Sequence, residues 1–356
     1  MDRPVLFPFV RELVAHERLQ EFAQAIGLGP RPERARVSES ALPLVLSALY
    51  ETLERPLVVL LPENEDARDA AEAASWFIGD ERVAFLPGRG VRWGSGLEPP
   101  PHLVGERARA LDVLARGGLV CASAAALADL LPPPAARPEP IRLAVGEETG
   151  IEGLAQQLAL AGYERVERAD ERGQFAVRGG ILDVFPTTGR EPLRIEFFGD
   201  EIEQIRAFSP FTQRALRPVV DCVIYPAAER RLDLAEPSLD DRSVVPNDLV
   251  APLPGPPDLV WQREDAVRVW EEEGYAPVGL KGAAELSPFP SGQPFSFEAQ
   301  RPALAARGLS EAENELAAFV RAGQRVVVAF PHTGDALRGR KAKVLLCKEW
   351  RLDDVG

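Results

Sequence analysis

A short stretch of alternating polar and apolar residues carries the clearest chemical signal in this sequence. Within Gly173–Phe208, Arg194, Glu196 and Phe198 are spaced two residues apart, with apolar residues between them. A period of two places the two sets on opposite faces of a β-strand. An arginine, a glutamate and an aromatic side chain exposed together on a rigid sheet are typical of a binding surface. Solvated cross-strand pairs around one exposed Phe are the plainer alternative, and spacing alone favours it.

The elements that would position these residues are strands joined by tight turns. Strand-like runs follow one another in this order: Phe175–Val177, Ile181–Phe185, Leu193–Phe198 and Ile202–Phe208. The turns between them contain suitable Gly, Thr and Asp residues, at Gly179-Gly180, Thr187–Glu191 and Gly199-Asp200. The sequence therefore predicts a half-buried antiparallel sheet with one core face. Arg178 is expected near the charged residues of the other face.

No phosphate-binding loop is visible. Such a loop needs glycines that wrap the phosphates, a Lys that neutralises them and a Ser or Thr for magnesium. The first loop that could bind a phosphate lies within Arg36–Leu46, which has neither glycine nor lysine, and the first lysine of the chain is Lys281. Ser38 is expected to cap a helix. Gly88–Pro101 is expected to be a loop that leads into prolines instead of a helix, so we predict no nucleotide and no other cofactor.

Composition limits the possible functions. The chain has 356 residues, of which 46% are hydrophobic, enough for roughly two or three domains with cores of their own. The formal net charge of −14 argues against broad DNA affinity, because phosphate binding needs clustered Lys and Arg. No apolar run approaches the roughly 20 residues of a membrane span, and no signal peptide opens the chain. We expect a cytoplasmic protein with no membrane partner.

Cysteine and histidine are too scattered to suggest a metal site. The members of each type lie far apart in the sequence: Cys121, Cys222 and Cys347, and His16, His102 and His332. This spacing predicts no metal, no zinc cluster and no disulfide framework. The cysteine usage fits a reducing cytosol.

Strands and helices alternate in the first part of the chain. Helices are expected at Arg11–Ile26, Leu42–Leu53, Ala67–Ile78, Glu106–Ala115 and Ala124–Leu131, and strands at Arg34–Val37, Leu57–Leu61, Val83–Leu86 and Leu119–Ala122. Because the strands are continuously apolar, they predict a parallel sheet covered on both faces, as in a doubly wound α/β domain.

A proline-rich linker, Pro132–Pro140, separates this domain from the antiparallel sheet. A strand at Ile141–Val145 and a helix at Ile151–Ala161 precede the sheet, so we predict a small α+β domain there. The region beyond it is rich in proline. It is expected to contain strands at Val219–Tyr225, Asp258–Trp261 and Gln324–Phe330 and a helix at Glu264–Glu273.

The antiparallel stretch also carries a long and specific resemblance. Phe175–Pro186 reads FAVRGGILDVFP and Arg194–Ile202 reads RIEFFGDEI, which resembles the shared signature of UvrB and the bacterial transcription-repair coupling factors (Mfd). Agreement continues through Phe208–Arg214 to the sequence YPAAE at Tyr225–Glu229. The form RGGILDVFP is more similar to the coupling factors than to UvrB. Members of both groups act in nucleotide excision repair, and the looser resemblance covers about residues 10–330.

The resemblance implies an α/β fold of the UvrB-like kind. We expect a degenerate doubly wound parallel-sheet domain over 30–137, a small α+β antiparallel-sheet domain over 140–213, a second, Pro-rich lobe from 1–29 and 214–330, and at 331–356 either the start of a truncated next unit or a non-native tail.

In this family the small domain binds UvrA. The family uses an Arg shortly after a Gly-Tyr, the Arg of Arg-Gly, and an Arg and a Glu on the later strand, which match Arg165, Arg178, Arg194 and Glu196. Where UvrB carries a further Arg two residues before the Arg-Gly, this chain has Ala176, so its charge pattern is thinner by one. With the resemblance we favour the binding interpretation of the charged face.

The resemblance also implies which activities are missing. UvrB has a phosphate-binding loop and a tyrosine-rich hairpin that stacks on bases, whereas the matching regions here lack the Gly and Lys and have Trp93 as their one aromatic residue. We expect no enzyme activity in this chain; the alternative is a UvrB-like DNA-dependent ATPase with an unrecognised nucleotide site. RNA polymerase and DNA are expected partners of the full-length protein, through domains beyond residue 356 that include a translocase motor. With no masking domain in the chain, we expect the UvrA-binding face to be open.

Overall fold

The computed structural model describes residues 4, 6–26, 33–92, 95–132, 134–233, 243–244, 258–263, 284–288, 292, 294–299, 314 and 317–322. The predicted helix Glu264–Glu273, the predicted strand Gln324–Phe330 and the tail 331–356 lie outside these residues. The chain divides into two compact units, Met1–Ala299 and Gln300–Gly356, and the description below concerns the first.

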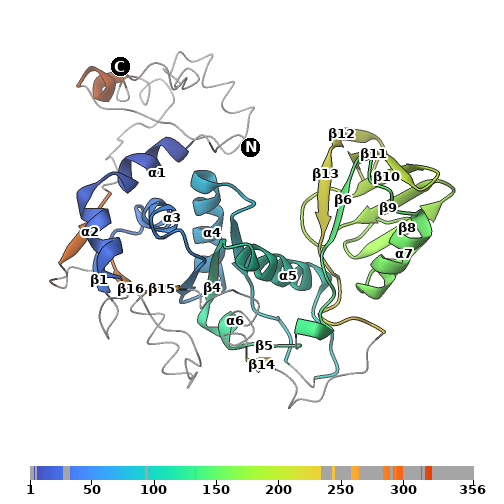
Figure 1. Ribbon diagram of the computed structural model, residues 1–356, viewed down its shortest axis with the longest axis horizontal. Coiled ribbons are helices and arrows are strands. Elements are labelled where there is room, and N and C mark those ends of the chain that lie inside the picture. Colours follow the sequence, from blue (N-terminus) through green and yellow to red (C-terminus); the bar gives the residue numbers. More distant parts are fainter. Residues whose placement is uncertain are drawn as a thin grey trace. The chain divides into compact units, whose positions relative to one another are not determined.

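A sheet of seven parallel strands lies at the centre of one part of this unit (Figure 1), in the order β17-β1-β16-β15-β2-β4-β3. Its strands are β1 (Glu33–Val37), β2 (Leu57–Leu61), β3 (Val83–Leu86), β4 (Leu119–Ser123), β15 (Asp258–Arg263), β16 (Ala284–Ser287) and β17 (Phe295–Phe297). Every residue of β2, β3 and β4 is buried, as expected of apolar strands covered on both faces. We call it the parallel sheet.

Helices cover both faces of the parallel sheet. On one face lie α1 (Phe7–Val14), α2 (Glu17–Ala25), α3 (Leu42–Leu53) and α4 (Asn64–Ile78), and on the other α5 (Pro101–Ala115) and α6 (Ala124–Ala128). The alternation of side chains along β2 divides the core accordingly, because Leu57 and Val59 join the first layer and Val58 the second. The predicted α/β class is confirmed.

Three local predictions were wrong. The helix expected at Arg11–Ile26 is two helices, because the chain turns at His16, whose Nδ1 accepts a hydrogen bond from the Arg18 N–H at 3.2 Å and caps α2. The Gly/Pro loop does lead into a helix, since Pro101 is the first residue of α5, where a missing N–H is harmless. Ser38 does not cap α3; its Oγ accepts a hydrogen bond from the Ala299 N–H at 2.8 Å.

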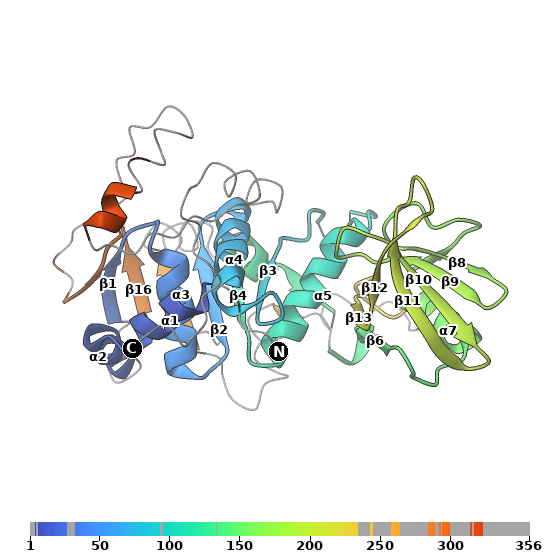
Figure 2. The same ribbon diagram turned by 90° about the horizontal axis from the view of Figure 1, so that it is seen from above.

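Strands from the proline-rich region complete the parallel sheet. β15 pairs with β2, and β16 and β17 pair with the two sides of β1. Figure 2 shows β1 and β16 side by side. Parts of the predicted second lobe therefore share a sheet with the predicted α/β domain, while the domain boundaries themselves stay a prediction.

A second sheet, here called the antiparallel sheet, has six strands in the order β12-β11-β10-β9-β8-β7. Its strands are β7 (Glu164–Arg165), β8 (Gln174–Arg178), β9 (Ile181–Phe185), β10 (Leu193–Phe198), β11 (Glu201–Phe208) and β12 (Ala215–Val219). All neighbours are antiparallel except β7 and β8. The hairpins predicted at Gly179-Gly180 and Gly199-Asp200 are confirmed.

Shorter elements flank the antiparallel sheet. Helix α7 (Ile151–Leu160) packs against one face, and β6 (Ile141–Ala144) pairs with β13 (Asp221–Ile224). The strand predicted at Val219–Tyr225 is confirmed as β13, which is shorter at both ends because β12 ends at Val219. β5 (Leu130–Leu131) pairs with β14 (Ser243–Val244), and η1 (Pro134–Ala136) is a 3-10 turn. None of the helices in the described part of the chain is long and apolar enough to cross a membrane.

Candidate partner-binding surface

The antiparallel sheet has one core face and one polar face. Phe175, Leu182 and Ile195 point to the core face and pack with Leu154 and Leu158 of α7. We call the opposite face the outer face. Read from strand alternation and register, its residues include Ala176, Arg178, Ile181, Asp183, Arg194, Glu196, Phe198 and Arg206.

Register brings three of the four residues matched to the family onto the outer face. Ile181 of β9 lies opposite both Arg178 and Glu196, so these three residues form one cross-strand row. Asp183 lies opposite Arg194 in the neighbouring row. The placement predicted from the period of two is therefore what the strand pairing produces, whereas the binding role stays a prediction.

Arg194 is held by a buried carboxylate. Its Nε and Nη2 lie 2.7 and 2.8 Å from the two carboxylate oxygens of Asp183, and Asp183 is only 6% exposed. The guanidinium carbon also lies 4.8 Å from the centre of the Phe208 ring. The hydrogen bonds to Asp183 raise the pKa of Arg194 further above its usual value. Bidentate pairing of this kind fixes the guanidinium plane, so Arg194 is part of the scaffold as well as of the surface.

Glu196 is also paired within the sheet. Its carboxylate accepts a hydrogen bond from Arg206 of β11, and both side chains are partly exposed. A half-exposed pair such as this contributes little to stability but fixes the direction of both charges. The sequence reasoning identified Arg194 and Glu196 but missed Asp183 and Arg206, their partners. A lone Asp inside the apolar run Ile181–Phe185 was the available signal.

Arg178 and Phe198 lie at the tips of two hairpins and are the most accessible of the set. Arg178 is exposed, and its Nε donates to the Glu167 carbonyl oxygen at 3.1 Å. Phe198 is 79% exposed and directly precedes Gly199, whose φ of 63° permits the tight turn. The outer face thus combines paired charges in its middle with an exposed guanidinium and an exposed aromatic ring near its edge.

Arg165 is not on this face. β7 pairs in parallel with β8, and Arg165 lies opposite Phe175, a core residue. Partners in a parallel pair point to the same side, so Arg165 leaves the strand toward the α7 side. The neighbouring contact agrees, since Gln174 Nε2 lies 3.4 Å from Glu164 Oε2. Arg165 is exposed, and within the described residues its side chain has no hydrogen bond or ion pair.

Ala176 is the position where the family pattern has an additional Arg. It belongs to the outer face but is only 2% exposed. The segment between β7 and β8 is anchored on this side, because Arg178 holds the Glu167 carbonyl and Arg168 donates to the Pro210 carbonyl at 2.6 Å. A long side chain at 176 would have to displace this cover, so the missing charge has a structural counterpart here.

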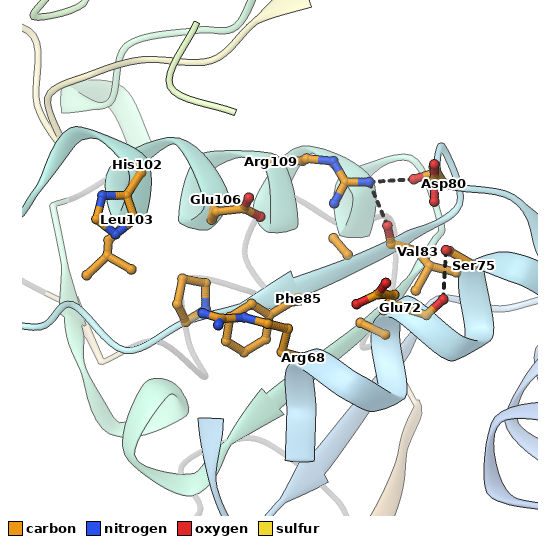
Figure 3. Close-up of a pocket in the computed structure, with 13 residues that line it drawn as sticks. Arg68, Glu72, Ser75, Asp80, Val83, Phe85, His102, Leu103, Glu106 and Arg109 are labelled. Atoms are coloured by element: carbon orange, nitrogen blue, oxygen red, sulfur yellow. Dashed lines mark hydrogen bonds between the residues drawn. The ribbon is translucent and has the colours of Figure 1, made fainter. Parts of the chain in front are cut away.

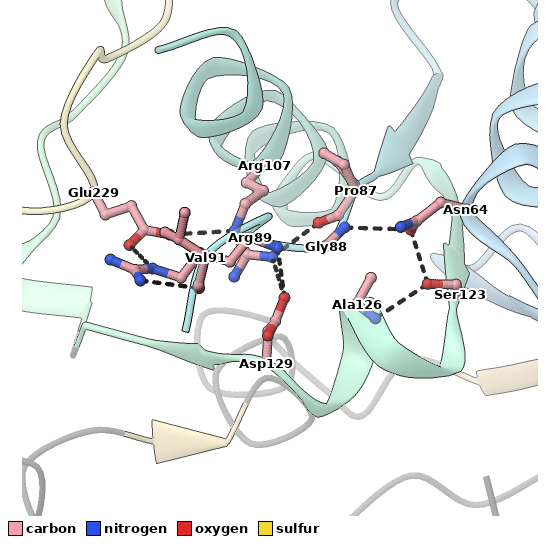
Figure 4. A network of polar contacts seen from close by, with 10 residues as sticks. All are labelled: Asn64, Pro87, Gly88, Arg89, Val91, Arg107, Ser123, Ala126, Asp129 and Glu229. Carbon is pink, nitrogen blue, oxygen red and sulfur yellow. Dashed lines mark hydrogen bonds and ion pairs between the residues drawn. The ribbon is translucent and has the colours of Figure 1, made fainter. Parts of the chain in front are cut away.

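Polar residues that the sequence reasoning missed join the segment after β13 to α5 and to the loop that precedes this helix. Arg89 Nε and Glu229 Oε2 are 2.7 Å apart, and Arg107 Nη1 donates to the Pro87 carbonyl at 2.8 Å and faces Asp129 (Figure 4). Burial lowers the pKa of Arg107, while the carboxylates of Glu229 and Asp129 oppose that shift. Glu229 is the last residue of the YPAAE motif, so this part of the shared signature stabilises the fold through buried ion pairs.

Close packing reinforces the same junction. Tyr163 Oη and Thr187 Oγ1 donate to the Tyr225 carbonyl oxygen at 2.6 and 2.9 Å, and the Tyr225 hydroxyl lies 3.0 Å from Asp112 Oδ2. A Cβ at Gly105 of α5 would lie 2.1 Å from Thr187 Oγ1, so this helix position requires glycine. The YPAAE motif is therefore held on both sides by buried contacts.

A cavity of about 340 Å3 lies at the carboxyl ends of β1, β2 and β16, the usual ligand position in an open α/β sheet. We call this site the carboxyl edge. Its charged lining residues are Glu39, Asp66 and Asp69, with no Lys or Arg among the described residues around it. Pro43 also removes a backbone N–H donor from the start of α3. This lining repels phosphate groups.

A second cavity, of about 300 Å3, lies between α4, β3 and α5 (Figure 3). Arg109 closes one side, donating to the Asp80 and Val83 carbonyls at 2.5 and 2.9 Å, and the Arg68 guanidinium lies 5.1 Å from the centre of the Phe85 ring. Arginine and carboxylate side chains are mixed around this cavity, so its lining favours neither anionic nor cationic ligands. In the part of the chain that the structure describes, no group of His, Cys, Asp and Glu could hold a metal ion.

Comparisons with known proteins bear on the antiparallel sheet first. Residues 141–229 match the family model described as the UvrB interaction domain. The UvrABC system protein B of Thermotoga neapolitana is 42% identical over 89 residues, which are 25% of this chain and 13% of that protein.

Longer similarities extend beyond this domain. The transcription-repair-coupling factor of Mycobacterium tuberculosis (strain CDC 1551 / Oshkosh) is 35% identical over 226 residues, 61% of this chain, and that of Myxococcus xanthus is 34% identical over 221 residues, 58% of it. The matched part spans only 18% of the length of either relative. The resemblance suggested by the sequence motif is thereby confirmed: this chain is similar to the transcription-repair-coupling factors and contains a match to the UvrB interaction domain.

Proposed function

We propose that this chain is a non-catalytic UvrB-homology module of a transcription-repair coupling factor, which recruits UvrA in nucleotide excision repair. The proposed contact is the outer face of the antiparallel sheet, with Arg178, Arg194, Glu196 and Phe198 as its main residues. Arg165, on the other side of the edge strand, would contribute at most from the rim. A cytoplasmic location is part of this proposal.

The observation that supports the proposal most strongly is that the residues matched by the UvrB interaction domain contain the whole antiparallel sheet and therefore its outer face. The family model covers residues 141–229, which include every strand of the antiparallel sheet. On its outer face, the Asp183 carboxylate and the β9–β10 pairing hold Arg194 in one orientation. Charged groups fixed before binding lose little entropy on association, and an exposed aromatic ring beside them is a typical anchor.

The direct test is UvrA binding by Arg178→Ala and Phe198→Ala variants of the whole chain. Truncation of the exposed Phe198 should leave the thermal unfolding midpoint within about 1 °C, whereas truncation of Arg178 also removes its hydrogen bond to the Glu167 carbonyl and should lower the midpoint by no more than about 4 °C. If each is an anchor, its loss costs about 2 kcal/mol, a rise in Kd of roughly 30-fold, measured by isothermal titration calorimetry.

A matched control is Arg18→Ala on α2, where the arginine side chain is 65% exposed and, among the described residues, pairs with Glu21 of its own helix. Its Kd for UvrA should equal that of the unchanged chain. Unchanged affinity in both Arg178→Ala and Phe198→Ala would remove the outer face as the binding site. An equal loss of UvrA affinity in the Arg18→Ala control would point to non-specific electrostatic attraction between the chain and UvrA.

The alternative function is a DNA-dependent ATPase of the UvrB kind. The carboxyl edge is where such a fold would hold a nucleotide, and the three carboxylates of its lining disfavour it. Binding of RNA polymerase and DNA is proposed only for a full-length protein, because the relatives are several times longer than their matched part.

A further inference from the structure

We propose that the loop Ser209–Arg214 is a second anchor of the same partner surface, with Phe211 inserting into UvrA at the opposite end of the sheet from Phe198. This inference rests on the proposed function and extends it. Phe211 is 91% exposed, the highest value among the large hydrophobic side chains described, and it lies between β11 and β12. Leaving a large apolar ring in water is unfavourable unless a partner covers it.

The loop is ordered by its own hydrogen bonds. The Ser209 N–H donates to the Arg214 carbonyl at 3.0 Å and the Gln213 N–H to the Ser209 carbonyl at 2.8 Å. The Gln213 side-chain amide donates to the Pro210 carbonyl at 2.9 Å. Phe211 is therefore presented on a fixed backbone, which lowers the entropy lost when it is covered.

Backbone strain and a side-chain contact couple the loop to the proposed binding residues. Gln213 has a φ of 58°, a left-handed conformation that is unfavourable for a residue with a side chain. Its Oε1 accepts a hydrogen bond from Arg194 Nη2 at 3.3 Å, and Arg168 donates to the Pro210 carbonyl at 2.6 Å. Arg194, itself held by Asp183, thus fixes the loop that carries Phe211.

Strand direction separates the two aromatic residues. Phe198 lies before the turn that opens β11, and Phe211 follows the far end of β11. The eight residues of that strand span roughly 25 Å at about 3.3 Å per residue. Between the rings lie the pairs Arg194–Asp183 and Glu196–Arg206, whose charges already neutralise each other. The partner surface that fits is one with two apolar pockets separated by a polar strip.

The test compares UvrA binding by Phe211→Ala, Phe198→Ala and the double variant, using the full chain and titration calorimetry. Phe211→Ala should raise Kd by about tenfold, because one of two aromatic anchors is lost. Trp76→Ala is the control, since Trp76 is a 51% exposed aromatic residue on α4, outside the antiparallel sheet. It should leave Kd unchanged, and all variants should keep the thermal unfolding midpoint.

The outcomes separate this inference from the function on which it rests. Weaker binding in Phe198→Ala with unchanged binding in Phe211→Ala would overturn the second anchor and leave the outer face as the UvrA site. Unchanged binding in both, together with Arg178→Ala, would remove the outer face and this inference with it. Weaker binding in both phenylalanine variants, with the Trp76→Ala control unaffected, supports a surface that extends along the whole of β11.

Discussion

The outer face and the carboxyl edge arrange charge in opposite ways. On the outer face Arg194 and Glu196 each have an opposite charge within the sheet, Asp183 and Arg206. At the carboxyl edge the charged lining residues are all carboxylates. Paired charges can orient a bound protein without creating a strong net electrostatic potential, which suits docking to another protein. A cluster of charges of one sign instead repels ligands of that sign.

The difference shows that a fold and its site are specified separately. The strands of the parallel sheet are retained by apolar burial, which many sequences provide, while phosphate binding depends on a few residues at one loop. The loop after β1 lies at the carboxyl edge and has none of those residues. In the antiparallel sheet the same residues, Arg194 and Asp183, contribute both to packing and to the surface.

The largest expected effect is that of Arg194→Ala, which breaks the pairing on the outer face. Asp183 would remain buried without its partner, and the free energy of unfolding should fall by about 3 kcal/mol in urea denaturation. The double variant Arg194→Ala with Asp183→Ala should recover part of that loss, because no buried charge is then left unpaired. A fall below about 1 kcal/mol in the single variant would show that water reaches Asp183 freely.

Ala176→Arg gives the next largest effect and tests why this chain departs from the family pattern. Because Ala176 is 2% exposed, an arginine must displace the covering segment, at a cost of about 2 kcal/mol in the free energy of unfolding. The added charge should not tighten UvrA binding. Ile181→Arg, at a position that is 37% exposed on the same face, is the matched control for charge alone and should unfold within about 0.5 kcal/mol of the unchanged chain. A tighter complex with unchanged stability would contradict the burial argument.

The sequence predicted the bounds of the strands better than which strands pair with one another. Leu57–Leu61 and Val83–Leu86 were predicted at their observed bounds, because a continuous apolar run has sharp ends. The pairing of β15 with β2 was not predictable, since it joins residues about two hundred positions apart and local patterns do not specify such contacts. The break at His16 was missed because histidine is an unusual helix cap.

For the candidate site, too, the sequence predicted which face each β10 residue occupies but not its partners on the neighbouring strands. The period of two placed Arg194, Glu196 and Phe198 on one face, since strand geometry alone decides that. Their partners depend on register: Asp183 lies opposite Arg194 only because the β9–β10 connection has its observed length. The position of Arg165 was missed for the same reason, because the parallel pairing of β7 sets its face.

A small effect is expected for Arg165→Ala, which sharpens the boundary of the outer face. Its side chain leaves β7 toward the α7 side, so the Kd for UvrA should change by less than about threefold, compared with roughly 30-fold for Arg178→Ala. Titration calorimetry on the two variants under the same salt conditions provides the comparison. Equal losses in both would show that the bound partner wraps around the edge strand β7.

The smallest expected effect is that of nucleotide at the carboxyl edge. A bound ligand raises the unfolding midpoint in proportion to the logarithm of its concentration over Kd, so ATP with magnesium at millimolar concentration should move it by less than about 1 °C if Kd is far above that range. Repulsion from Glu39, Asp66 and Asp69 is the physical reason.

Replacing these three by Gln, Asn and Asn removes the repulsion without supplying a glycine-rich loop or a lysine, so the variant should still show no shift in its unfolding midpoint. A shift in this variant alone would identify charge as the single obstacle. A shift of several degrees in the unchanged chain, with hydrolysis stimulated by DNA, would overturn the non-catalytic part of the proposed function and favour the ATPase alternative.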